Sequence, residues 1–146
     1  MSDEKKPQFS IQRIYVKDVS FESPNSPSIF KDWAKAAPDL AVDLNTQHNH
    51  LEEEFWEASI TIKATVKSND QVAFMCEVQQ AGIFTLQNIP EKEINQLLET
   101  IAIEAIYPFA REVISDLVTK AGFPQLLLAP INFDAFYKEK LKQQQK

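Results

Sequence analysis

This sequence contains very little glycine and cysteine, and each scarcity removes a class of function. Its 146 residues include two glycines, Gly82 and Gly122. Dinucleotide-binding fingerprints and phosphate-binding loops need several glycines for tight turns and close backbone approach, so both are excluded. The single cysteine, Cys76, can form neither an internal disulfide nor a multi-thiolate metal site. It lies in an apolar stretch, which predicts a small buried side chain in a protein of a reducing compartment.

The sequence also lacks any long apolar run. No uninterrupted stretch reaches the ~18 apolar residues of a membrane-spanning helix. The stretch from Met1 to Phe9 is charged and has no apolar segment of the kind found in secretory signals. We therefore expect a cytoplasmic protein that does not insert into membranes directly.

Basic residues are outnumbered by acidic ones, 15 to 21, which gives a net charge of −6. This balance opposes binding to nucleic acid and favours partners with basic or unfolded segments. The apolar and charged fractions, 44% and 25%, are ordinary for a globular protein. Length and composition predict one domain over residues 1–141, followed by a short polar tail at 142–146.

Apolar and polar residues alternate in four segments, as in half-buried strands. These segments are residues 9–22, 40–45, 56–66 and 71–79. The short polar links 48–50 and 68–70 have the length of hairpin turns, so the strands are predicted to form an antiparallel meander. In the first strand Ile14 and Val16 interrupt the polar parity, which predicts apolar spots on the face that carries Asp18 and Glu22.

The period changes to that of a helix after Leu86. Pro90 and the acids after it open a helix, and an apolar face with 3.6-residue spacing follows to Ala121. Pro108 is expected to kink this long helix, and Asn132 is expected to cap a last one. Strands followed by helices predict an α+β fold. Its form is a four-stranded antiparallel sheet with a long bent helix and a C-terminal helix on one face.

No set of catalytic or metal-binding residues emerges from the sequence. His48 and His50 precede three glutamates and have the composition of a metal cluster, but the same pattern is typical of a solvated hairpin tip. A nucleophile would need a base and an orienting acid nearby, and the only two histidines lie on the predicted turn. We therefore predict no metal, no cofactor and no enzymatic activity.

Aromatic and acidic residues allow two interpretations each. The aromatics Phe30, Trp33, Phe133, Phe136 and Tyr137 lie outside the main apolar stripes. They either cover an ordinary core or line a groove, roofed by a loop, for side chains of an extended peptide. The acids at 18, 22 and 77 either form a solvated sheet face or meet a partner.

Five segments together resemble one known family. They are Ile-Gln-Arg-Ile-Tyr-Val-Lys-Asp-Val-Ser-Phe-Glu-Ser-Pro-Asn at 11–25, Phe-Lys-Asp-Trp at 30–33, Phe-Met-Cys-Glu-Val-Gln-Gln-Ala-Gly-Ile-Phe at 74–84, Pro-Phe-Ala-Arg-Glu-Val-Ile at 108–114 and Phe-Pro-Gln-Leu-Leu-Leu-Ala-Pro-Ile-Asn-Phe-Asp at 123–134. In this order, over nearly the whole chain, they resemble the SecB family of bacterial protein-export chaperones.

The resemblance implies an ATP-independent holdase that keeps secretory precursor proteins unfolded and delivers them to the translocation ATPase SecA. It implies a homotetramer, built as a dimer of dimers, with the long helices packed between two sheets. It also assigns residues to roles. SecA binding falls to Asp18, Glu22, Met75 and Glu77, and the subunit interface to Cys76, Val78 and Gln80.

The family's client groove lies between the sheet and the loop after the first strand. The resemblance carries it over to Trp33, Leu40, Val42 and Leu44, with Phe133 and Phe136 as further candidates for its wall. The alternative is a small-molecule carrier or enzyme that uses the groove between sheet and helix as a closed pocket. A carrier would enclose one ligand and need no tetramer, whereas a chaperone would bind many unrelated unfolded chains.

Overall fold

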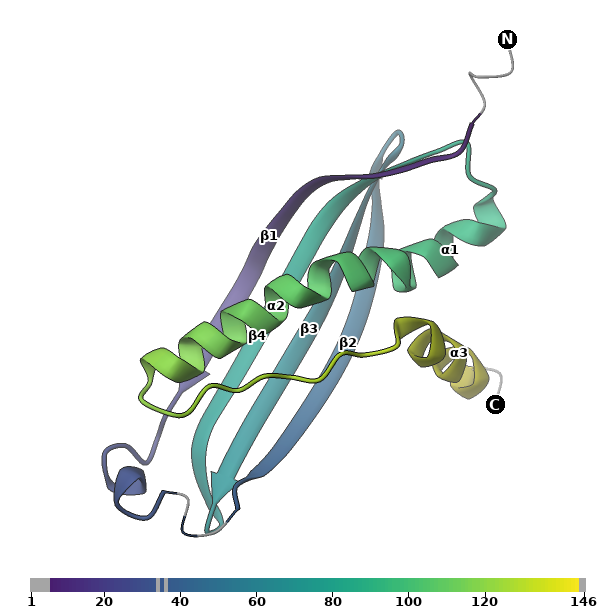
Figure 1. The fold of residues 1–146 in the computed structure, drawn as a ribbon. Coiled ribbons are helices and arrows are strands. Elements are labelled where there is room, and N and C mark those ends of the chain that lie inside the picture. The colour runs from purple at the N-terminus through teal and green to yellow at the C-terminus, as the bar shows by residue number, and fades with distance from the viewer. Residues whose placement is uncertain (1–5, 34, 36, 145–146) are drawn as a thin grey trace.

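The computed structural model describes residues 6–33, 35 and 37–144, and it forms two layers. One layer is an antiparallel sheet with the order β1-β4-β3-β2, built from β1 (Gln8–Glu22), β2 (Asp39–Glu52), β3 (Phe55–Ser68) and β4 (Gln71–Gln87). The other contains α1 (Glu91–Glu99), α2 (Ile101–Lys120) and α3 (Phe133–Gln144), all on one side of the sheet (Figure 1). The predicted α+β fold class is confirmed. The sheet has a helix-side face and an open face.

Strand β1 departs from simple alternation at two β-bulges. Its pairing with β4 shifts between Ile11 and Arg13 and again between Val16 and Asp18. Each bulge sets two residues opposite one, so the side chains after it change parity. Ile14 and Val16 consequently pair with residues of the helix-side face, while Tyr15 joins Asp18 on the open face. The expected apolar spots from Ile14 and Val16 on the acidic face were therefore wrong.

The first predicted hairpin turn was also misplaced. β2 continues through residues 48–50, and the turn lies at Glu53 and Glu54, where Glu53 adopts a φ of 50°. Polar residues in this stretch resemble a turn because strand β2 is at the edge of the sheet and much of it faces solvent. The second turn is confirmed: Asn69 and Asp70 both have positive φ, as tight hairpins require.

The long helix is divided at Thr100, and α2 continues through Pro108. Thr100 has φ −117° and ψ −78°, which separates α1 from α2. Pro108 lies inside α2, where it and Glu104, whose carbonyl loses its helical partner, are both exposed to solvent. α2 ends as predicted at Gly122, whose φ of 96° suits glycine. There the backbone N–H groups of Gly122 and Phe123 donate to Thr119 and Val118.

The core lies between the helix-side face and α2. Its largest fully buried side chains come from β3, β4 and the helices. α2 approaches β4 closely at Gly82, where an added Cβ would lie 2.9 Å from the Phe84 ring and 3.1 Å from Ile106. Asn132 caps α3 as expected, accepting the N–H of Ala135 at 3.0 Å. α3 includes Lys142–Gln144 of the predicted tail, whereas residues 145–146 lie outside the described residues.

Candidate binding surfaces on the two sheet faces

The acids that the sequence singled out gather on the open face. Glu22 pairs with Met75, and Asp18 pairs with Gln79, two residues from Glu77 on β4. Asp18 and Glu22 are exposed, and Met75 and Glu77 are half-buried. The fold therefore brings the four predicted residues onto one surface, here called the acidic face, at the end of β1 where the chain leaves the sheet. An electropositive partner could dock there without touching the helices.

A buried carboxylate beside the acidic face was missed by sequence reasoning. Glu57 of β3 accepts hydrogen bonds from the Tyr15 hydroxyl and, at 3.2 Å, from Lys17 Nζ. Burial alone would raise the pKa of Glu57, but these hydrogen bonds outweigh it and hold the pKa below its ordinary 4.5. Burial and the contact with Glu57 raise the pKa of Tyr15. Only the bulges, which place Tyr15 on this face, could have revealed the cluster.

On the helix-side face, Trp33 fastens the first loop to the end of α2. Its ring packs edge-on against Phe123 at 5.0 Å, and Phe30 meets the same ring at 5.0 Å. Phe123 in turn lies 5.1 Å from Phe74 of β4. Trp33 is half-buried, so it anchors the loop and still presents surface. Ile29, from the short 3₁₀ helix η2 (Ser28–Lys31), is buried beneath the loop.

The other predicted groove residues lie along the edge strand β2. Leu40 and Val42 are 47% and 38% exposed, and Leu44 is half-buried on the same face. Leu44 and Phe136 line one cavity of about 190 Å³ between β2 and α3. Phe133 is different: it is 1% exposed and packs against Tyr107 at 5.2 Å and Phe136 at 6.2 Å. It supports the wall from behind and offers no surface to a ligand.

The predicted interface residues lie inside the chain. Cys76, Val78 and Gln80 are at most 2% exposed and belong to the face of β4 that α2 covers. Burial raises the pKa of the Cys76 thiol to about 11. Gln80 donates to the backbone carbonyl of Tyr15 at 3.1 Å. Any effect on assembly has to pass through the packing around these side chains, and their role in assembly stays a prediction.

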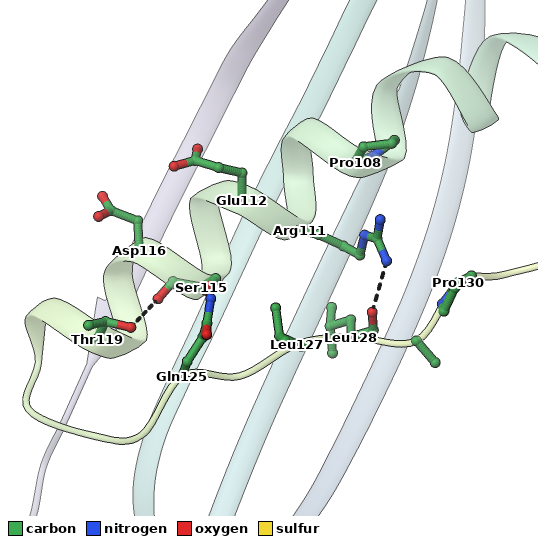
Figure 2. Close-up of a pocket in the computed structure, with 11 residues that line it drawn as sticks. Pro108, Arg111, Glu112, Ser115, Asp116, Thr119, Gln125, Leu127, Leu128 and Pro130 are labelled. Carbon is green, nitrogen blue, oxygen red and sulfur yellow. Dashed lines mark hydrogen bonds between the residues drawn. The ribbon is translucent and has the colours of Figure 1, made fainter.

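A further groove, not foreseen from the sequence, runs between α2 and the extended segment 125–130 (Figure 2). Its volume is about 730 Å³. Arg111 donates to the carbonyl of Leu128 at 3.2 Å, and Gln125 donates to Ser115 at 3.0 Å, so the segment is tied to the helix at two points. Leu128 is buried, whereas Leu127 is 73% exposed. The sequence alone could not show which of the three consecutive leucines is buried and which is exposed.

No helix in the described part of the chain is long and apolar enough to cross a membrane. A family model described as "Preprotein translocase subunit SecB" matches residues 2–144. The chain is 48% identical over 144 residues to protein-export protein SecB of Pseudomonas fluorescens (strain Pf-5), covering 98% of this chain and 89% of that protein. It is 48% identical over 139 residues to protein-export protein SecB of Idiomarina loihiensis, covering 94% and 81%.

The fold also matches a solved structure, that of the Mycobacterium tuberculosis Rv1957 SecB-like chaperone in complex with a ChAD peptide from the HigA1 antitoxin. The TM-score is 0.71 at 16% identity, over 84% of this chain and 90% of that one. At this identity the match establishes a shared fold.

Proposed function

Because this chain belongs to the SecB family, we propose that it is an ATP-independent holdase, which keeps secretory precursor proteins unfolded and delivers them to SecA. The observation that carries the proposal is the separation of two surfaces by one sheet. Exposed apolar residues follow β2 on the helix side, and the acidic face lies on the other side. A client and a delivery partner can therefore be bound at the same time.

Client capture follows from what an unfolded chain displays. Folded domains seldom expose long apolar stretches, whereas an unfolded precursor does, so an apolar groove selects by folding state. Trp33, Leu40, Val42 and Leu44 are the proposed contact residues, with Phe136 in the wall and Phe133 behind it. The free energy comes from burial of client side chains, so no nucleotide, cofactor or catalytic step is needed.

Assembly as a homotetramer would strengthen this capture. Several grooves that engage one client raise avidity by ~10²–10⁴ through effective concentration. Exposed apolar residues outside the groove support such an assembly: Ile11, Val16 and Val19 lie on edge strand β1, and Ile101 and Phe109 lie on α2. A dimer of dimers, with the helices packed between two sheets, would cover them.

Delivery to SecA is proposed to use Asp18, Glu22, Met75 and Glu77. Charge complementarity steers encounters with an electropositive surface, and salt weakens them. The protein's net charge of −6 suits this role and opposes binding to nucleic acid. The setting for such delivery is the cytoplasm, where precursors await export.

The deciding experiment follows the refolding of a slowly folding precursor, with and without its signal sequence, in the absence of nucleotide. The expected result is slower refolding, with the client held unfolded. Retardation that required nucleotide hydrolysis would refute the holding mechanism. If unfolded clients were ignored while one small molecule bound tightly, the groove would belong to a carrier.

A further inference from the structure

A buried ion cluster joins three elements that are far apart in the sequence. Glu99, the last residue of α1, is 7% exposed. Lys140 of α3 donates to both of its carboxylate oxygens, at 3.0 and 3.3 Å, and to Thr46 Oγ1 of β2 at 3.3 Å. His48 of β2 completes what we call the Glu99 cluster: Glu99, Lys140, Thr46 and His48.

The ring nitrogen of His48 that faces Glu99 is Nδ1, and this is the nitrogen that gains a proton when the ring becomes charged. Its Nε2 lies 2.9 Å from Asn95 Oδ1, an acceptor, so the proton of the neutral ring belongs on Nε2. Nδ1 then turns a lone pair toward Glu99 Oε1, 3.6 Å away. Protonation converts Nδ1 into a donor. The contact with Glu99 accordingly raises the pKa of His48 above its ordinary 6.5, against the opposing effects of burial and Lys140.

The cluster lies beside the proposed client groove. Thr46 and Lys140 line the cavity that contains Leu44 and Phe136. They also line a second cavity of about 430 Å³, together with His48 and Glu99. The first residue of α3, Phe133, is buried in the core, but every residue of α3 after it is exposed or half-buried. Lys140 therefore supplies the main polar attachment of the distal half of α3.

We propose that the Glu99 cluster docks the distal half of α3 against β2, so that it sets the width of the Leu44–Phe136 cavity, and that protonation of His48 loosens this docking. The proposal rests on the proposed function in one respect, namely that this cavity belongs to the client groove. Glu99, Lys140 and His48 are positioning residues in this scheme.

The direction of the pH effect depends on which cation remains beside Glu99 when α3 undocks. With His48 neutral, departure of Lys140 strands a carboxylate among buried groups, which is costly. With His48 protonated, the imidazolium stays beside Glu99 and replaces Lys140, and the repulsion between the two cations is relieved. Undocking of α3 is therefore easier at lower pH.

The surroundings contain few other charged groups that could produce the same effect. α3 contributes Tyr137 to the larger cavity and Glu139 to the smaller one. On β2, His50 stacks on Trp56 of β3 at 4.4 Å and bonds the carbonyl of Glu53. Glu104 of α2 lines a separate cavity. Among the described residues, His48 is therefore the histidine that contacts Glu99, and this contact raises its pKa from the ordinary 6.5.

The test measures amide hydrogen exchange of residues 137–144 in the full-length protein at about pH 6 and about pH 8, corrected for intrinsic exchange rates. Wild-type protection should fall at least about fivefold at the lower pH, the lower end of typical coupling between sites. His48→Gln should abolish this pH dependence. Lys140→Met should lower protection at the higher pH about tenfold, and Lys140→Arg should restore it.

The matched control is Lys138→Met, which breaks an exposed ion pair with Asp134 on the same helix. It should leave both protection and its pH dependence unchanged. Equal effects of Lys138→Met and Lys140→Met, or pH dependence that survives His48→Gln, would overturn the proposal.

A second measurement separates this proposal from the proposed function. The dissociation rate of a fluorescent unfolded client is followed for the same variants, and release should accelerate wherever α3 protection falls. If the client dissociation rate did not change with the hydrogen-exchange protection of α3, the role of α3 in the groove would be overturned. If wild-type protein bound no unfolded client at either pH, the proposed function would fail, while the exchange data would still decide whether the cluster docks α3.

Discussion

Val78→Ala is expected to lower the stability of the folded chain, and any loss of assembly is expected to accompany that destabilisation, because the side chain is buried. Val78 is fully buried and pairs with Val19 on one side and Ile62 on the other. The change deletes two methyl groups, which costs about 1.6 kcal/mol in transfer free energy. The cavity left behind brings the expected loss to about 2 to 3 kcal/mol, a large part of the ~5–15 kcal/mol that stabilises a typical domain. Val78→Asp would bury an unpaired charge at the same place and is expected to prevent folding.

Val16→Ala is the matched control, because Val16 lies on the same face but is 42% exposed on edge strand β1. It should change the free energy of unfolding by no more than about 0.5 kcal/mol. If β1 contributes a subunit contact, the assembly should weaken. Urea unfolding at several protein concentrations gives the stability, and sedimentation velocity gives the assembly state.

The refuting result is the reverse pattern. If Val78→Ala dissociated the assembly while each subunit kept its wild-type stability, Val78 would make a direct contact between subunits. The chain would then have to expose β4 in the assembled state, and the packing of α2 described above would not apply to it.

Three further predictions concern the binding surfaces and the buried acids. Asp18→Lys combined with Glu77→Lys should greatly weaken SecA binding in calorimetry, and wild-type affinity for SecA should fall as salt rises. Asp43→Lys, on the far edge strand, is the control. Equal losses of SecA affinity in the two variants would show that the acidic face is not the SecA-binding surface. Trp33→Ala should raise the client dissociation constant about tenfold, and SecA binding should not change; an unaltered client affinity would remove this residue from the groove. Glu57→Gln should cost about 2 kcal/mol near neutral pH. Since the pKa of Glu57 is lowered in the folded state, the wild-type advantage exists above about pH 4.5 and is lost as pH falls through the folded value, which urea unfolding across that range would show.

The existence and type of most elements could be predicted because they depend on local periodicity. Alternation in four segments predicts the sheet, and the 3.6-residue period after Pro90 predicts the helices. The bulges of β1 were not predictable, since nothing in the local sequence marks an extra residue until the partner strand is known. The break at Thr100 was missed because no proline or glycine marks it, whereas Pro108 lies inside α2 at a position exposed to solvent.

The same distinction between local pattern and tertiary packing separates the site residues that could be predicted from those that could not. The acidic face could be placed because Asp18 and Glu22 share a parity after the second bulge. Phe133 was misjudged, because an aromatic at the start of a helix reads the same in sequence whether it faces the core or a groove. Glu57 and Glu99 were overlooked because a charged residue is ordinarily exposed. Their burial depends on cations, Lys17 and Lys140, that only the tertiary fold brings near.

The two bulges in β1 also bear on how the proposed holdase avoids forming a continuous sheet with the unfolded chains it would bind. β1 is an edge strand with unpaired backbone groups, the usual template for uncontrolled strand addition. Its regular ladder is divided into Gln8–Ile11, Arg13–Val16 and Asp18–Glu22. An arbitrary extended polypeptide meets a misfit at each interruption and can pair over only one short stretch. Edge β2 has no such interruption between Asp39 and His50, so an invading strand should be tolerated there and rejected at β1.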